Sequence, residues 1–123
     1  MPDEMKKESH LYGVEIDSLT GRIAKAIYPE AEINIQGFEN TRYLNNSFDL
    51  AVGNVPFGNY HVNDKGYNEH RFLIHDYFIA KMIDQVRPGG LVAVITSKGT
   101  LDKQDSSARK YFARRADLIR AIR

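Results

Sequence analysis

The sequence predicts an α/β fold in which a mostly parallel sheet is flanked by helices, within one domain of residues 10–123. Short apolar segments rich in β-branched residues alternate along the chain with segments of helical periodicity. Most of these short segments are apolar on both sides, which is typical of strands buried within a parallel sheet. The expected order is β-α-β-β-α-β-α-β. Residues 1–9 lack periodicity and are expected to form a disordered or extended arm.

The first half of this domain contains three predicted strands, at residues 10–16, 31–36 and 48–53. Between the first two we expect a helix, capped at its start by Asp17 and ended by Pro29. Its apolar side chains recur every four residues along one face. They are Leu19, Ile23 and Ile27.

The second half begins with residues 60–69, which are rich in Asn, Asp, Gly and His and have no apolar pattern. We expect a mobile loop here that could cover a site at the sheet edge. The longest helix is predicted at residues 70–86, followed by a turn and a buried strand at 91–96. A further helix at 106–116 and a strand at 118–122 complete the chain.

Composition narrows the class of protein. The chain has no cysteine, which excludes disulfides and thiolate zinc sites. No apolar run is long enough to cross a membrane, and residues 1–10 are too polar for a signal peptide. We therefore expect a cytoplasmic protein without a membrane partner. Residues 98–123 hold eight Lys and Arg against three Asp and Glu, a net charge of +5. This basic end either faces a nucleic acid backbone or forms a solvated helix face.

The third predicted strand ends in the turn Asn54-Val55-Pro56-Phe57. Such a turn suits a flat molecule that carries an exocyclic amino group. The Asn54 carboxamide oxygen and the Val55 carbonyl can accept both amino hydrogens, Pro56 makes the turn rigid, and Phe57 can stack on the ring. Those hydrogen bonds would free the nitrogen lone pair for attack on an electrophile. The alternative is an ordinary proline-containing turn that ends a core strand.

Four segments in the same order resemble the adenine-N6 DNA methylases of phages and mobile elements, which are often fused to a helicase. Many of those relatives have proline where this chain has Val55. The resemblance implies a Rossmann-like methyltransferase fold, S-adenosylmethionine (SAM) as cofactor and DNA as partner, in a restriction-modification or mobile-element setting. It also implies that Asn54, Val55, Pro56 and Phe57 are the catalytic residues. The four segments are residues 52–58, 72–78, 86–90 and 95–100.

The same resemblance implies further binding residues. Glu15, near the end of the first strand, takes the position that holds the SAM ribose diol in the family. The alternative is a strand-end carboxylate that caps the next helix, a role that suits Asp17 better. Phe38 and Glu39 stand where many relatives have an Asp-Phe pair in the opposite order. Either Phe38 packs on the cofactor adenine, or Glu39 accepts from its amino group, or both belong to a plain loop. Lys98 either contacts a nucleic acid phosphate or is a solvated turn lysine.

No metal site is predicted, because the histidines and aspartates of residues 61–76 lack a recognised ligand spacing. His75 lies on the apolar stripe of the long helix. We expect a core histidine whose ring is hydrogen-bonded to a carbonyl.

The family also has a glycine-rich loop, upstream of the position of Glu15, that wraps the methionine part of SAM. The only glycine before Glu15 is Gly13, inside the predicted strand. We therefore expect a fragment of a longer protein, which could also carry a helicase domain. The isolated chain is expected to be inactive, to bind SAM poorly and to self-associate through unpaired strand edges.

The function favoured by these observations is SAM-dependent methylation of the adenine amino group in DNA, by direct attack of that nitrogen on the SAM methyl group. Two alternatives remain open. One is an amino-methyltransferase that modifies RNA or protein glutamine, since these substrates also present an amino group on a planar carbon. The other is a noncatalytic nucleic-acid-binding module with the same fold.

Overall fold

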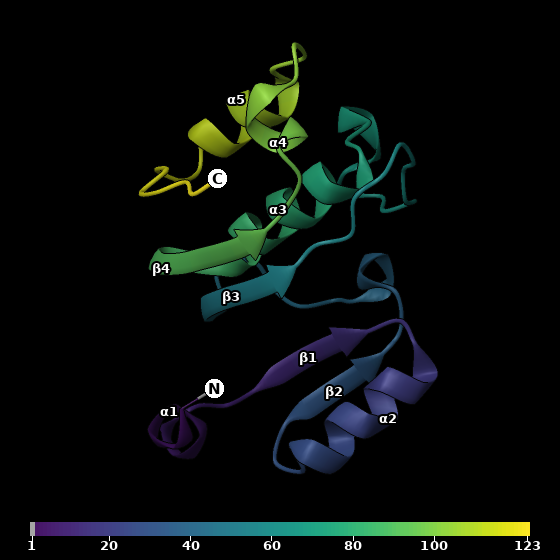
Figure 1. Ribbon diagram of the computed structural model, residues 1–123, viewed down its shortest axis with the longest axis vertical. Coiled ribbons are helices and arrows are strands. Elements are labelled where there is room, and N and C mark those ends of the chain that lie inside the picture. Colours follow the sequence, from purple (N-terminus) through teal and green to yellow (C-terminus); the bar gives the residue numbers. More distant parts are fainter. Residues whose placement is uncertain (1) are drawn as a thin grey trace. The chain divides into compact units, whose positions relative to one another are not determined.

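The computed structural model describes residues 2–123 and divides into two compact units. Unit 1 ends at Thr41, and unit 2 spans Arg42–Arg123 (Figure 1). Within the described residues each unit holds one sheet of two parallel strands. The predicted fold class is therefore wrong. Four of the five expected strands form and pair in parallel, but they do not join into one extended Rossmann-like sheet.

Unit 1 builds its sheet around a capped helix. The Asp17 carboxylate accepts a hydrogen bond from the Thr20 backbone N–H at 2.6 Å, which confirms the predicted cap. Strands β1 and β2 pair in parallel from Tyr12 with Glu32 to Glu15 with Ile35. The elements of unit 1 are α1 (Asp3–Glu8), β1 (Tyr12–Glu15), α2 (Ser18–Ile27), β2 (Glu32–Ile35) and the short 3₁₀ helix η1 (Phe38–Asn40).

Helix α2 packs on its sheet through its glycine side rather than through its apolar stripe. Gly21 is buried, and a Cβ added there would come within 2.7 Å of the Ile35 side chain. The helix can approach the strand this closely because no side chain stands between them. The stripe of Leu19, Ile23 and Ile27 is exposed. Periodicity thus predicted the helix correctly, but not which side of it faces the sheet.

Unit 2 is organised around its longest helix. Helix α3 covers one face of the two-stranded sheet, with Met82 beneath Gly53 of β3. Its side chains supply half of the buried hydrophobic core, including Ile74, Tyr77 and Ala80. The elements of unit 2 are β3 (Phe48–Asn54), the 3₁₀ helix η2 (Asn68–His70), α3 (Ile74–Gln85), β4 (Val86–Ile95), α4 (Gly99–Asp102) and α5 (Ser107–Ala113).

Strand β4 begins earlier than expected, at Val86, and includes the glycines where a turn was predicted. Gly89 adopts a positive φ of 81°, and a Cβ at Gly90 would lie 2.7 Å from the Asp49 carbonyl oxygen. These glycines therefore let β4 bend and approach β3, where the strand register shifts. By contrast, the strand predicted at 118–122 does not form. Its apolar side chains remain exposed, and no sheet in the described residues pairs with it.

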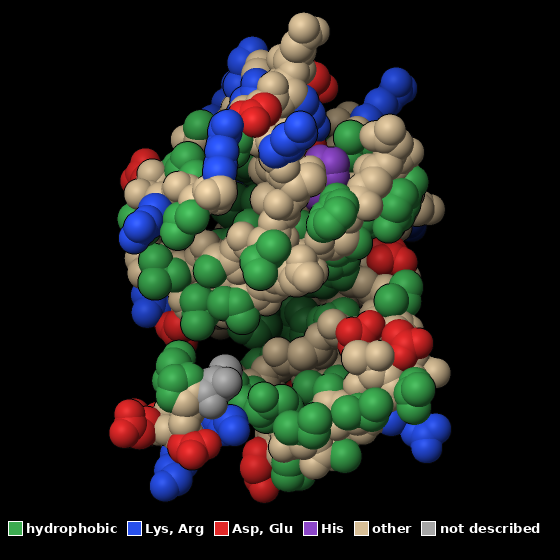
Figure 2. All heavy atoms as spheres, viewed as in Figure 1, with side chains coloured by type: hydrophobic (Ala, Val, Ile, Leu, Met, Phe, Trp, Pro, Cys, Tyr) green, Lys and Arg blue, Asp and Glu red, His purple; other side chains and the backbone are tan. Residues whose placement is uncertain are grey.

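The face of the β3–β4 sheet opposite α3 carries exposed apolar side chains, visible as a hydrophobic area over these strands in Figure 2. A two-stranded sheet is marginally stable by itself, and apolar faces of this kind commonly mark interaction surfaces. We call these residues the open sheet face. They are Leu50, Val52, Leu91 and Ile95.

Helix length and composition bear on membrane association. Among residues 2–123, no helix is both long enough and apolar enough to span a bilayer.

Candidate functional site

The turn after β3 is anchored to the neighbouring strand. Asn54 is the last residue of β3 and lies opposite Ile95 in β4. The Val55 backbone N–H donates to the Ile95 carbonyl at 3.1 Å, and the Val55 side chain is only 2% exposed. Burial of Val55 therefore fixes the position of the chain just after β3.

The side chains around this anchor reach solvent. Asn54 is exposed, Pro56 is half-buried, and Phe57 is 60% exposed. An aromatic ring so open to water gains little from packing inside the unit, and its free face can stack on a planar ligand. The structure thus presents an amide and a ring at one sheet edge. Their contact with a base stays a prediction.

Lys98 lies at the same edge. Strands β3 and β4 run in the same direction, and their arrowheads end together in Figure 1. After β4, the Thr96 and Thr100 hydroxyls are 2.8 Å apart and fold the chain into α4, at whose start Lys98 stands exposed. A parallel pair thereby brings Asn54 and Lys98 to one edge, although 43 positions separate them in the sequence.

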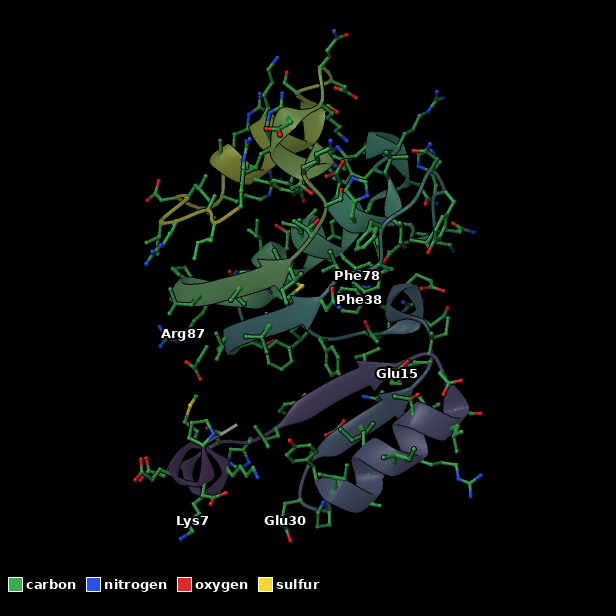
Figure 3. The ribbon with its side chains drawn as sticks, in the orientation of Figure 1. Lys7, Glu15, Glu30, Phe38, Phe78 and Arg87 are labelled. Carbon is green, nitrogen blue, oxygen red and sulfur yellow. The ribbon has the colours of Figure 1, made fainter. Side chains whose placement is uncertain are left out.

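Unit 1 carries the residues expected to hold the cofactor. Glu15 ends β1, and Phe38 and Glu39 follow β2 in η1, at the matching end of the parallel pair (Figure 3). The Glu15 Oε1 atom accepts from the Asp17 backbone N–H at 2.9 Å, which leaves its other oxygen for a ligand. The Glu39 carboxylate folds over Gly37, where an added Cβ would overlap it.

These residues fit SAM only in part. One oxygen of Glu15 can accept from a ribose hydroxyl. Phe38, which follows the neighbouring strand β2, is half-buried. No glycine-rich loop adjoins them in unit 1 to hold the methionine part. We therefore assign no methyl-transfer step to this edge of the sheet.

The basic end of the chain divides into paired and unpaired cations. Lys103 pairs with Asp76, Arg115 lies 3.1 Å from Asp84, and Arg123 lies 2.5 Å from Asp102. Lysine and arginine side chains gather over α4 and α5 in Figure 2. We call the exposed cations of residues 98–123 that have no ion pair within the described chain the basic patch. They are Lys98, Lys110, Arg114 and Arg120.

Asp84 joins the loop after β3, helix α3 and helix α5. It accepts hydrogen bonds from the hydroxyls of Tyr67 at 2.7 Å and Tyr111 at 2.6 Å. Arg115 completes the cluster by lying 3.5 Å over the Tyr111 ring. Burial, together with the charge and hydrogen bond of Asp84, raises the pKa of both tyrosines. They therefore remain protonated donors at neutral pH.

A second carboxylate ties the same loop to α3. Asp64 accepts from the Tyr77 hydroxyl at 2.7 Å and from the Lys81 ammonium at 2.8 Å. Burial acts to raise the pKa of Asp64, but the hydrogen bonds from Lys81 and Tyr77 outweigh it and hold the pKa below its usual value. The loop that we expected to be mobile is thus attached to α3 at Asp64 and to Asp84 at Tyr67.

No local sequence pattern indicates these clusters. Asp84 is 17 residues from Tyr67 and 27 from Tyr111, so no local spacing joins them. His75 is buried as expected, at 6% exposure, but neither of its ring nitrogens has a hydrogen-bond partner. The expected carbonyl bond is therefore wrong, and the Asp76 Oδ1 atom lies 3.7 Å from His75 Nε2. Residues 2–123 hold no cluster of three potential metal ligands.

Comparison with known proteins gives one informative likeness. No protein-family model matches the chain, and no solved structure matches it. The chain is similar to Defense against restriction protein B of Escherichia phage P1, with 36% identity over 115 residues. That match covers 89% of this chain but only 5% of the phage protein.

This comparison corrects the function expected from the sequence. The phage protein is named for defence against restriction, not as a methyltransferase, and no methyltransferase family model matches. The prediction of a SAM-dependent adenine-N6 DNA methyltransferase is therefore wrong, as are its enzyme class and the RNA or glutamine variants. Short motifs at a strand end specify a turn more surely than an activity. The predicted link to restriction agrees with the name of the phage protein. The comparisons themselves establish only a likeness to a small segment of that protein.

Proposed function

We propose that this chain is a DNA-binding segment of a longer protein that acts in defence against restriction. The name of the phage relative supports the role in restriction, since restriction acts on DNA. The chain spans about 5% of that relative's length, and only DNA binding is proposed for it. A DNA partner also favours the cytoplasm, in agreement with the lack of cysteine.

The observation that carries the proposal is the basic patch. Its four cations are exposed and have no carboxylate partner in the described chain, although the whole chain has a net charge of only +1. Unpaired lysines and arginines on one short segment attract phosphates and release counterions when phosphates bind. The acidic side chains of residues 98–123 cancel only part of this charge, because the segment holds eight Lys and Arg against three Asp.

The turn after β3 supplies the second part of the interface. Phe57 can stack on an unpaired base, which in single-strand binding proteins contributes about 1–3 kcal/mol per base. Asn54 and the Val55 carbonyl can accept from an exocyclic amino group of that base. The preferred ligand is therefore single-stranded or locally opened DNA rather than an intact duplex.

Fluorescence anisotropy with a labelled single-stranded adenine-containing oligonucleotide tests the proposal. We expect binding that weakens by roughly tenfold or more when Lys110 and Arg114 are both changed to Gln, because two phosphate contacts are lost. Arg87→Gln is the matched control, since Arg87 is exposed but is paired with Asp49 outside the basic patch. Equal affinity for the double variant and the wild type would refute the proposal.

A further inference from the structure

Unit 2 contains a pocket of about 190 Å³ between the loop after β3 and helix α3. Three of its lining residues are aromatic, one is an arginine and none is acidic. This volume is below the roughly 300 Å³ at which sites for drug-sized ligands begin, so it suits one small ring or group. The lining residues are His61, Val62, Tyr67, Asn68, Arg71, Phe72 and Tyr77.

The aromatic wall of this pocket is held in place without a ligand. The Tyr67 hydroxyl is bound to Asp84, and the Tyr77 hydroxyl to Asp64. The two rings meet edge to face, with centroids 5.5 Å apart. A wall that is already ordered loses little conformational entropy when a planar group binds against it.

The rim of the pocket is positive. Arg71 is exposed, has no ion pair in the described part of the chain, and adopts a left-handed conformation with φ of 51°. His61 Nδ1 lies 2.7 Å from the Phe72 carbonyl oxygen. A carbonyl only accepts, so Nδ1 carries the proton and Nε2 is left free to contact a ligand. The nearby carboxylates of Asp64 and Asp84 are each paired with a cation, Lys81 or Arg115.

We propose that this pocket receives the base of one nucleotide, which packs against Tyr67, while the phosphate of that nucleotide lies at Arg71 on the rim. A purely apolar ligand would leave the Arg71 charge unused, and a metal ion would find no carboxylate in the lining. A nucleotide of a bound DNA strand and a free nucleoside monophosphate offer the same chemistry. The DNA source rests on the proposed function, while the free nucleotide does not.

Titration of the whole chain with deoxyadenosine monophosphate, followed by NMR, tests the pocket directly. We expect shift changes at the aromatic signals of Tyr67, Phe72 and Tyr77. Arg71→Asn should weaken binding by about tenfold or more, as expected for loss of a charged hydrogen-bond donor. Asn is chosen because it tolerates the left-handed backbone better than other uncharged residues. Arg22→Asn, which removes an exposed arginine on α2 of unit 1, outside both the pocket and the basic patch, should leave the affinity unchanged.

A variant that blocks the pocket distinguishes binding in the pocket from an effect of lost positive charge alone. Val62→Trp adds a large side chain to the pocket lining while it removes none of the hydrogen bonds that fix the wall. It should abolish the aromatic shift changes. Absence of those changes in the wild type, or equal weakening by Arg71→Asn and Arg22→Asn, would overturn the pocket proposal.

A parallel titration with the oligonucleotide separates the two sources. If its binding also depends on Arg71, the nucleotide belongs to DNA. If the monophosphate binds at Arg71 while the oligonucleotide binds nowhere, the pocket stands for a free nucleotide and the proposed function fails. If the oligonucleotide binds only through Lys110 and Arg114, the pocket proposal for DNA fails and the proposed function stands.

Discussion

Removal of the Asp84 carboxylate should cause a large loss of stability in unit 2. Asp84→Ala removes the acceptor of two tyrosine hydroxyls and the partner of Arg115. Hydrogen bonds to a charged group contribute about 1.5–3 kcal/mol each, which gives roughly 3–6 kcal/mol for the two phenols. The Asp84 side chain is 14% exposed, so water can replace part of this loss. We therefore expect a decrease of about 3 kcal/mol in the free energy of unfolding of unit 2.

Urea unfolding followed by circular dichroism measures this change. Asp84→Asn is the graded variant, because it keeps one acceptor oxygen but loses the charge, and it should lose about half as much. Asp49→Ala is the control. It also removes an aspartate that pairs with an arginine, but Asp49 is 81% exposed, so it should cost less than about 1 kcal/mol. If Asp84→Ala and Asp49→Ala destabilise equally, the cluster does not hold the loop, α3 and α5 together.

Three further predictions follow from other parts of the chain. Asp64 has a lowered pKa in the folded state, so its contribution is present above its ordinary pKa of 3.8 and is lost as the pH falls through the lowered value. Asp64→Asn should therefore flatten the acid side of the stability curve, and an unchanged curve would contradict this. The open sheet face should drive self-association of the isolated chain. Sedimentation velocity should show that Val52→Lys, which places a charge on that face, is more monomeric than the control Thr20→Lys. The control adds the same charge to an exposed position on α2 of unit 1. That the isolated chain binds SAM only weakly remains a proposal. Calorimetry should give an affinity weaker than micromolar, and Glu15→Ala should weaken it further. Micromolar binding would refute the proposal of weak binding.

Local signals in the sequence predicted the local structure well. The cap at Asp17, the helix after it and the strand that ends at Asn54 all form within a residue or two of the expected bounds. Each rests on neighbouring side chains, such as the carboxylate of Asp17 three positions before the amide that it accepts from. The turn at Asn54–Phe57 also lies at a sheet edge, because a proline after a strand stops it in any context.

Long-range relations could not be predicted in the same way. Whether four strands form one sheet or two depends on pairings that no periodicity encodes, and here each strand pairs with only one other strand. Leu118 and its neighbours have strand-like composition, but without a partner strand they remain irregular. The Asp84 cluster joins residues from three parts of unit 2 that share no motif.

The functional prediction was wrong for a related reason. Asn54, Pro56 and Phe57 show which contacts a turn can make, and those contacts serve binding as well as catalysis. The candidate residues also lie in two units, Glu15 in one and Asn54 in the other. Each edge can therefore be interpreted only by itself, and the basic patch of unit 2 is the feature that points to a partner.

The salt dependence of DNA binding tests the central claim most directly. If all four cations of the basic patch contact phosphates of a single strand, the logarithm of affinity should fall with that of salt with a slope of about −2.8. Affinity for the oligonucleotide should then drop roughly 50-fold between 50 and 200 mM salt, and the Lys110→Gln, Arg114→Gln variant should show about half that slope. Binding that does not change with salt, or no binding at 50 mM, would contradict the assignment of this chain as a DNA-binding segment.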